Sequence, residues 1–184
     1  MPLLDALLSP FSSVSELIEA GGWVLPWIFA TALIMWTLIA ERWWYFRRVY
    51  PARRAALQAE WRQRSDTQSW SALQVRAMLI SQANVAMGMS LPLLRVTVPI
   101  APLLGLLGTV TGMLEVFDGM MISGSADART MAYGVSHAMI ATLAGLVVSV
   151  SGMYFFNRLQ ARVQRETERF GDELPFDDVR GVTA

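Results

Sequence analysis

Three long blocks of apolar residues constrain this chain more than any other feature of its sequence. The blocks cover about 23–46, 96–118 and 131–157, and arginine-bearing segments separate them. A helix needs roughly 20 apolar residues to cross a bilayer, because its backbone groups bond internally while its side chains face lipid. Since each block reaches that length, the sequence predicts an all-α membrane protein with three transmembrane helices.

Composition supports this class and argues against several others. Apolar residues make up 54% of the 184 and charged residues only 16%, which is unlike a soluble domain. The formal net charge is zero, so the basic excess of a nucleic-acid-binding protein is missing. With no cysteine and a single histidine, few metal ligands are available. We therefore expect no enzyme activity, no metal, no cofactor and no nucleic-acid partner.

The positions of the arginines predict the orientation in the membrane. Segments 47–95 and 158–184 are rich in arginine, whereas the loop 119–130 contains only Arg129. Positively charged loops stay on the cytoplasmic side. We therefore expect 47–95 and 158–184 to be cytoplasmic, and the N-terminal segment 1–22 and the loop 119–130 to be periplasmic.

The segments outside the three blocks also show helical patterns. Leucines spaced three and four apart predict an amphipathic segment at the outer face over 1–22. Within the segment 47–95, the stretch from Pro51 to Met89 indicates two helices that continue the spans into the cytoplasm, with Asp66 or Thr67 available to cap the second. Pro99 and Pro102 are expected to bend the second span or to interrupt it. The cytoplasmic side chains that need a packing partner are Leu57, Trp61, Trp70, Leu73 and Met78.

Small residues recur three or four positions apart on the second and third spans. Such residues allow helix backbones to approach closely in lipid. Packing inside one chain is one explanation, but three helices bury too little to need so many small positions, so we favour association of several copies. The residues assigned to helix packing and oligomerisation are Gly105, Gly108, Gly112, Ala138, Gly145 and Ser149.

Polar residues at membrane depth are the candidates for an ion pathway. They include Thr109 on the second span, and Thr142 and His137 on the third. A single Thr hydroxyl often bonds a carbonyl of its own helix, but together these groups suggest a polar lining. An ionisable residue inside a span is a functional candidate, although a neutral His bonded to a neighbouring helix fits equally well. Glu115 either makes a polar contact between subunits at the outer end or reaches the headgroups, and we favour the headgroups.

Two motifs carry a resemblance to a known family. The runs LLGLLGTVTGM at 103–113 and GVSHAMIATLAGL at 134–146 resemble the MotA/TolQ/ExbB proton-channel family, at the spacing expected there. The run IAERWWYF at 39–46 and the residues ISGS at 122–125 are similar to the short ExbB proteins of secondary TonB systems. The resemblance covers roughly residues 20–160.

This resemblance implies a homopentamer in the bacterial inner membrane. The second and third spans would enclose a central pore occupied by the single helices of two ExbD-like subunits, whose membrane-embedded Asp takes up and releases the proton. Proton passage would energise a TonB-like protein for outer-membrane transport. Thr109 and Thr142 match the pore-lining threonines of the family, whereas the usual Glu of the third span falls on His137.

Two alternatives remain beside the ExbB-like function. The first is a TolQ-like subunit that serves envelope integrity, and the second is a structural membrane scaffold that conducts nothing. The flagellar stators of the family have four spans and a larger cytoplasmic domain, so this branch fits less well. Hydroxyl groups suit sodium as well as protons, and the transported substrate leaves no trace in the sequence.

Overall fold

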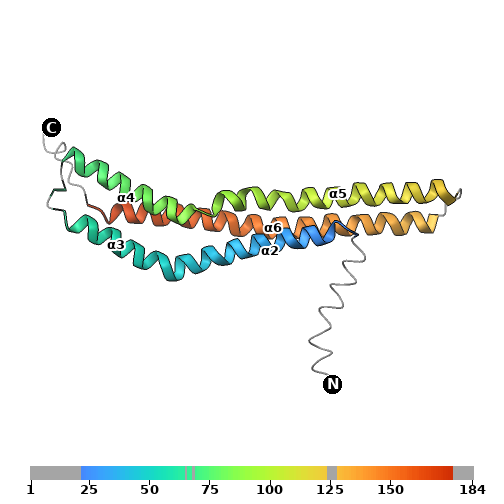
Figure 1. Cartoon of the computed structure of the whole chain (residues 1–184), viewed down its shortest axis with the longest axis horizontal. Helices are drawn as coiled ribbons and strands as arrows, with labels where there is room; N and C mark the ends of the chain where they lie inside the picture. Colours follow the sequence, from blue (N-terminus) through green and yellow to red (C-terminus); the bar gives the residue numbers. More distant parts are fainter. Residues whose placement is uncertain (1–21, 65, 68, 124–127, 176–184) are drawn as a thin grey trace, which may run out of the picture. The chain divides into compact units, whose positions relative to one another are not determined.

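Helices account for nearly all of the described chain (Figure 1). The computed structural model describes residues 22–64, 66–67, 69–123 and 128–175, apart from a few side chains between 123 and 137. The elements in chain order are α2 (Leu25–Trp44), the π-helix η1 (Tyr45–Val49), α3 (Tyr50–Arg62), α4 (Trp70–Gly88), α5 (Leu91–Ser123) and α6 (Ala128–Asp172). No strand occurs in these ranges, so the predicted all-α class is confirmed.

Three helical stretches are long and apolar enough to cross a membrane. They are Leu25–Arg62, Trp70–Ile122 and Gly134–Asp172, and each contains one of the three predicted blocks almost entirely. The prediction of three membrane-crossing helices is therefore confirmed, while the limits of each span in the bilayer stay predictions. The predicted outer segment 1–22 lies outside the described residues except for Gly22, as does the end of the tail from 176 onward.

The chain passes from α2 to α3 through a π-helix, for which Pro51 supplies a reason. Pro51 lies in the first turn of α3. A proline inside a helix lacks an N–H group and its ring collides with the carbonyl four residues earlier, which here belongs to Arg47 in η1. Widening the preceding turn into a π-helix separates these groups without ending the helix.

Helix α5 runs without interruption through both of its prolines. Pro99 and Pro102 lie inside the helix Leu91–Ser123. The expected interruption of the second span is therefore wrong. Membrane helices tolerate interior prolines, because neighbouring helices and local adjustments satisfy the freed carbonyls.

Helix α4 is capped by a residue different from the two predicted. The Ser69 hydroxyl accepts a 3.2 Å hydrogen bond from the Ala72 backbone N–H. The Asp66 carboxylate accepts a 3.1 Å hydrogen bond from the Ser69 N–H and so holds the capping residue from one step further back. A serine at this position satisfies one of the free N–H groups of the first helical turn. The predicted cap at Asp66 or Thr67 is therefore wrong.

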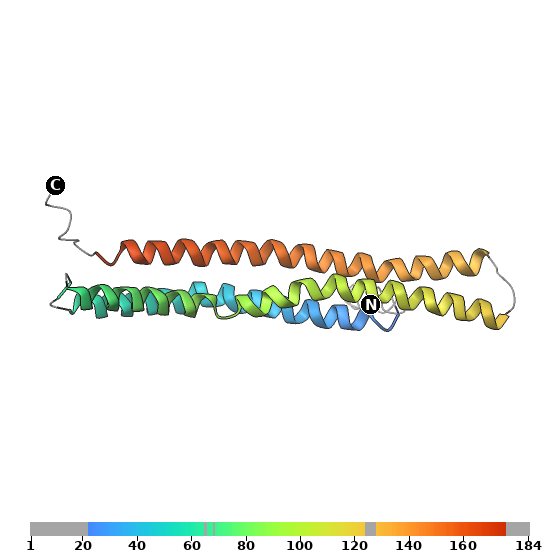
Figure 2. The same cartoon turned by 90° about the horizontal axis from the view of Figure 1, so that it is seen from above.

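The chain divides into two compact units, Met1–Trp36 with Arg95–Met153, and Thr37–Leu94 with Tyr154–Ala184. In the first unit, α5 and α6 run antiparallel beside each other, and the start of α2 lies against them (Figures 1 and 2). Val24, Leu25 and Ile28 form a buried cluster with Ala141 of α6. These contacts hold the beginning of α2 on the α5–α6 pair.

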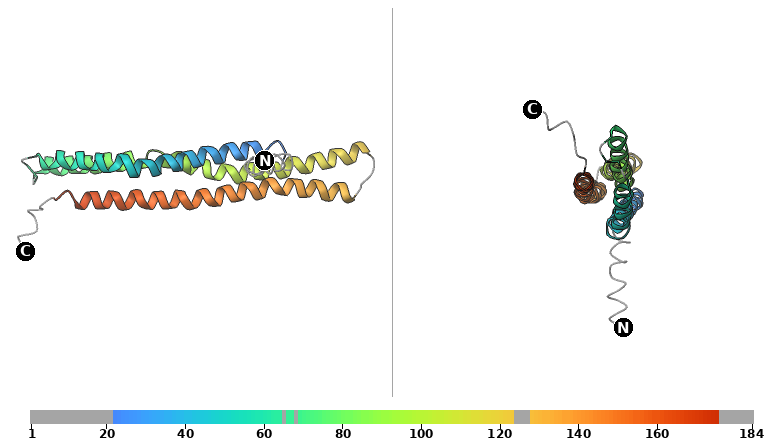
Figure 3. Two further views of the ribbon diagram at one scale, coloured as in Figure 1. Left: turned by 90° about the horizontal axis from the view of Figure 1, so that it is seen from below. Right: turned by 90° about the vertical axis from the view of Figure 1, so that its left-hand side faces the viewer.

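In the second unit, the end of α6 lies beside both α3 and α4 (Figures 1 and 3). Leu57 and Trp61 of α3 are buried, as predicted. On α4 the prediction was wrong, because Trp70, Leu73 and Met78 are exposed. The buried side of α4 consists instead of Ala72, Leu79, Ala83 and Met87, which lie seven and four residues apart on one face of the helix.

Two arginines join helices of the second unit through backbone carbonyls. Arg42 is 4% exposed and donates to the Ala86 and Met87 carbonyls at 2.9 and 3.3 Å. Arg76 donates to the carbonyls of Gly171 and Leu174 at 2.7 and 2.8 Å. Ala86, Met87 and Gly171 lie in the last turns of their helices, where carbonyls lack a partner four residues on and favour a cation, and Leu174 lies two residues beyond α6. Arg42 therefore closes the end of α4 and Arg76 the end of α6.

Candidate functional site

The candidate site is the seam between α5 and α6 in the first unit, where two glycines bring the backbones together. A Cβ atom on Gly145 would come within 2.5 Å of the Ala101 carbonyl oxygen and 3.3 Å of the Gly105 Cα. A Cβ atom on Gly105 would lie 2.9 Å from the Thr142 Cα. Because these neighbours are backbone atoms that cannot move aside, only glycine fits at both positions.

The same seam continues with glycine against alanine. A Cβ atom on Gly108 would meet the Ala141 side chain at 2.6 Å, and one on Gly112 would meet the Ala138 side chain at 2.9 Å. Ser149 is also buried in the first unit, at 8% exposure. The small residues assigned to oligomerisation thus pack α5 against α6 within one chain, which is the alternative explanation given above. Their use between copies stays a prediction.

The two candidate threonines of the ion pathway make different hydrogen bonds. The Thr142 hydroxyl donates across the seam to the Gly105 carbonyl at 2.9 Å. The Thr109 hydroxyl donates to the Leu106 carbonyl of its own helix at 2.8 Å. In each case the hydroxyl proton is used, while the oxygen keeps lone pairs that can accept from water or a hydrated cation. Both side chains are partly exposed, so these lone pairs remain accessible.

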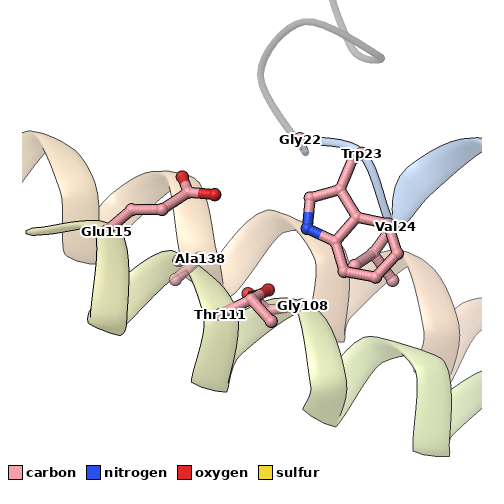
Figure 4. Close-up of a pocket in the computed structure, with 8 residues that line it drawn as sticks. Gly22, Trp23, Val24, Gly108, Thr111, Glu115 and Ala138 are labelled. Carbon is pink, nitrogen blue, oxygen red and sulfur yellow. Dashed lines mark hydrogen bonds between the residues drawn. The ribbon is translucent and has the colours of Figure 1, made fainter.

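At one end of the seam lies a small pocket of about 50 Å³, shown in Figure 4. Its walls come from the turn that precedes α2, from α5 and from α6. Glu115 and Trp23 face each other across it, with the indole nitrogen on the side of the carboxylate. The residues that line the pocket are Gly22, Trp23, Val24, Gly108, Thr111, Gly112, Glu115 and Ala138. Glu115 is an exposed residue that also lines this pocket, so it lies beside the seam.

His137 belongs to α6, but its side chain lies outside the described residues. The two readings of this residue, as a titrating group or as a neutral hydrogen-bonding one, therefore both stay open. Within the described residues, no three His, Asp or Glu side chains gather into a group that could hold a metal ion. The seam instead offers hydroxyl, carbonyl and carboxylate oxygens, which suit a proton or a hydrated monovalent cation.

A family comparison covers most of this architecture. The model of the MotA/TolQ/ExbB proton channel family matches residues 51–172, which include α4, α5 and α6. The chain belongs to the MotA/TolQ/ExbB proton channel family. The resemblance inferred from the two glycine-rich motifs is thereby confirmed, and the chain is a channel-family membrane protein and not an enzyme.

Members of both the ExbB and the TolQ branch are similar to this chain. The biopolymer transport protein ExbB of Helicobacter pylori is 36% identical over 91 residues, which cover 50% of this chain and 63% of that protein. An ExbB-like protein of Synechocystis is 39% identical over 88 residues, covering 45% and 35% of the two chains. The Tol-Pal system protein TolQ of Pseudomonas aeruginosa is 34% identical over 98 residues, covering 52% and 42%. The matches thus span from about a third to just under two thirds of each relative.

The segment that matches the MotA/TolQ/ExbB family contains both threonines, Glu115 and every glycine of the seam described above. Helix α2 precedes it. The wall of the pocket that carries Trp23 is therefore supplied by a part of the chain outside the matched segment.

Some residues that hold the fold escaped sequence reasoning. Arg42 lies in a basic aromatic run that reads as an interfacial rim, yet it is buried and bonds carbonyls of α4. Its bonds join residues 44 and 45 positions apart, and no local spacing indicates such a pair. Trp23 had no assigned role in the sequence, and the structure places it in the wall of the pocket.

Proposed function

We propose that this chain is an ExbB-like subunit of a motor in the bacterial inner membrane that is driven by the proton-motive force. An ExbD-like partner with a single span carries the membrane-embedded Asp that is protonated and deprotonated. The complex energises a TonB-like protein for outer-membrane active transport. The chain itself supplies pore wall and hydroxyl groups, and needs no cofactor besides the coupling ion.

The seam between α5 and α6 is the observation that carries this proposal. It lies within the family-matched segment, and its backbones are held together by Gly105, Gly145 and the Thr142 hydrogen bond. A wall that is rigid along this line can keep hydroxyl oxygens in fixed positions along a pathway. A scaffold that conducts nothing would have no use for accessible threonine oxygens at this depth.

Assembly into a homopentamer around a central pore is part of the proposal. Large apolar side chains are exposed on both sides of the seam, among them Leu103, Leu107 and Val110 on α5 and Val147 and Val150 on α6. Lipid and neighbouring copies would cover these surfaces. The orientation follows from the arginines, with the N-terminus periplasmic and the C-terminus cytoplasmic.

A TolQ-like function in envelope integrity is the second candidate, because the TolQ protein of Pseudomonas aeruginosa is 34% identical to this chain. The two functions use the same pore architecture and differ in the partners. Growth distinguishes them: an ExbB-like subunit restores growth on scarce iron chelates, and a TolQ-like subunit restores resistance to detergents.

The experiment that tests the proposal is co-expression with a single-span partner encoded beside it. We expect a complex in detergent whose mass corresponds to five copies of this chain with partner subunits, and which takes up protons when reconstituted in vesicles. Replacing the membrane Asp of the partner by Asn is the matched control and should abolish uptake. A complex that assembles but remains proton-tight in both forms would favour the structural scaffold.

A further inference from the structure

The pocket at the end of the seam is lined by the carboxylate of Glu115, although the predicted spans contain very few acidic residues. Glu115 lies in α5, about 12 Å along the helix axis from the last residue Ser123 at about 1.5 Å per residue. Between Arg95 and Gln164 the sequence has only two other acidic residues, Asp118 and Asp127. Asp118 is not among the residues that line the pocket, and Asp127 lies outside the described residues. Glu115 is exposed and is the one carboxylate among the described residues that line the pocket.

The space around Glu115 suits a water molecule. The pocket volume of about 50 Å³ exceeds the roughly 10–15 Å³ of free space that one water molecule needs in a cavity. The indole nitrogen of Trp23 faces the carboxylate across the pocket (Figure 4), and an indole N–H can only donate. The Thr111 hydroxyl already donates to the Leu107 carbonyl at 2.9 Å, so its oxygen can accept. A water in this pocket has a donor, an acceptor and a carboxylate as partners.

The charged surroundings of this carboxylate are sparse. On its own helix, Asp118 follows one turn later. The described part of α2 in this unit, up to Trp36, has no ionisable residue. Helix α6 contributes Ala138 to the pocket wall. The ionisable residues in the first turns of this helix are Arg129, Tyr133 and His137. No arginine or lysine lines the pocket to hold the carboxylate as a fixed anion.

We propose that Glu115 is the group that binds the proton as it enters the pathway. It lies at the end of the seam where the pocket is found. The carboxylate takes a proton from a hydronium ion in the pocket, which leaves a water molecule, and the neutral acid later returns that proton to a water further along the seam. This proposal rests on the proposed function. It assigns the carboxylate of the pathway on this chain to the second span, next to Ala138 of the third.

Chemical labelling of the purified chain tests the site without any partner. Dicyclohexylcarbodiimide reacts with protonated carboxyl groups in apolar surroundings, and peptide mass spectrometry locates the adduct. We expect the adduct at Glu115 and not at Asp118, with less labelling as the pH rises because the reactive protonated form is lost. No labelling at Glu115 at any pH would overturn the proposal. If sodium at constant pH protects Glu115 from labelling, the ion bound at this site is sodium and not a proton, which would also overturn the proposal.

Proton uptake by the reconstituted complex tests the role of the site. We expect Glu115→Gln to lower the rate about tenfold or more, Glu115→Asp to retain part of it, and Asp118→Asn to leave it unchanged. The melting temperatures of the variants are compared with that of the wild type to show that each variant folds. Glutamine has nearly the same shape as glutamate, so we expect equal melting temperatures for Glu115→Gln. Normal uptake by Glu115→Gln would overturn the proposal and leave the proposed function intact. A wild-type complex without uptake would instead count against the proposed function, while labelling still reports on the site.

Discussion

The Thr142 hydroxyl donates a 2.9 Å hydrogen bond to the Gly105 carbonyl oxygen, from one helix of the seam to the other. Gly105 is also the residue whose missing Cβ lets the Thr142 backbone come close. The close approach and the hydrogen bond therefore depend on each other, because a larger residue at 105 would separate the two groups that the bond joins. One threonine thus packs the two spans and, under the proposed function, also lines the pathway with its hydroxyl.

Replacing Thr142 by Val separates these two roles. The change keeps the shape and removes the hydroxyl, and hydrogen bonds between membrane helices contribute about 0.6 kcal/mol on average and at most about 1.7 kcal/mol. We expect a complex that still assembles in detergent but supports little iron-dependent growth. Thr142→Ser, which keeps the hydroxyl, is the control and should support growth. Full growth with Thr142→Val would show that the hydroxyl is not used in the pathway.

Replacing Gly145 by Ala should loosen the seam. The added methyl group would meet the Ala101 carbonyl oxygen at 2.5 Å, and overpacking of this kind costs about 1–3 kcal/mol. The matched control is Gly119→Ala in the same helix pair, because nothing lies within 4 Å of the added atom there. That change should stabilise α5 by about 0.5–1 kcal/mol. Thermal unfolding in detergent measures both, and equal melting temperatures would contradict the close packing.

Replacing Arg76 by Gln should release the end of α6. The variant loses two hydrogen bonds from a charged donor to the Gly171 and Leu174 carbonyls. Each bond of this kind contributes up to about 3 kcal/mol. We expect faster hydrogen exchange in the last two turns of α6, read by mass spectrometry of peptides. Arg53→Gln on the exposed side of α3 removes the same charge and should leave exchange unchanged. Unaltered exchange in the Arg76 variant would contradict the capping role.

Replacing His137 by Gln tests whether this residue titrates. Imidazole changes its charge between about pH 5 and 8, whereas an amide does not. We expect iron-dependent growth of the variant to persist but to lose part of its dependence on pH, because His137 would adjust the seam or its water and not carry the proton itself. The wild type measured over the same pH range is the reference. Identical growth curves at every pH would exclude a titrating role.

Much of the fold follows from the sequence because its cause is local. Length and apolarity alone require the three membrane-crossing helices, and glycines spaced three and four apart show which face of α5 and α6 packs closely. The partner of that face is a different matter. Gly105 and Gly112 could equally meet a neighbouring helix of the same chain or of another copy, because the spacing of small residues is the same in both cases.

The second unit shows a similar limit. Apolar side chains on α4 suggested a buried side containing Trp70 and Leu73, but the buried residues are Ala72, Leu79, Ala83 and Met87. These lie seven and four residues apart and so share one face of the helix, whereas the type of side chain alone did not show which apolar face is buried. Arg42 escaped for a different reason, since its carbonyl partners lie far away in the sequence.

The π-helix before α3 sets the rotational phase of everything that follows it in the same helical run. Ile39 and Arg42 are buried ahead of the π-helix, and Leu57 and Trp61 are buried after it. A residue occupies about 100° of an α-helix, so deleting one residue within Tyr45–Val49 would turn Leu57 and Trp61 by about that angle towards solvent. The widened turn before Pro51 thus sets the angle between the two stretches of this continuous helix. It keeps the buried residues before and after it on the same side.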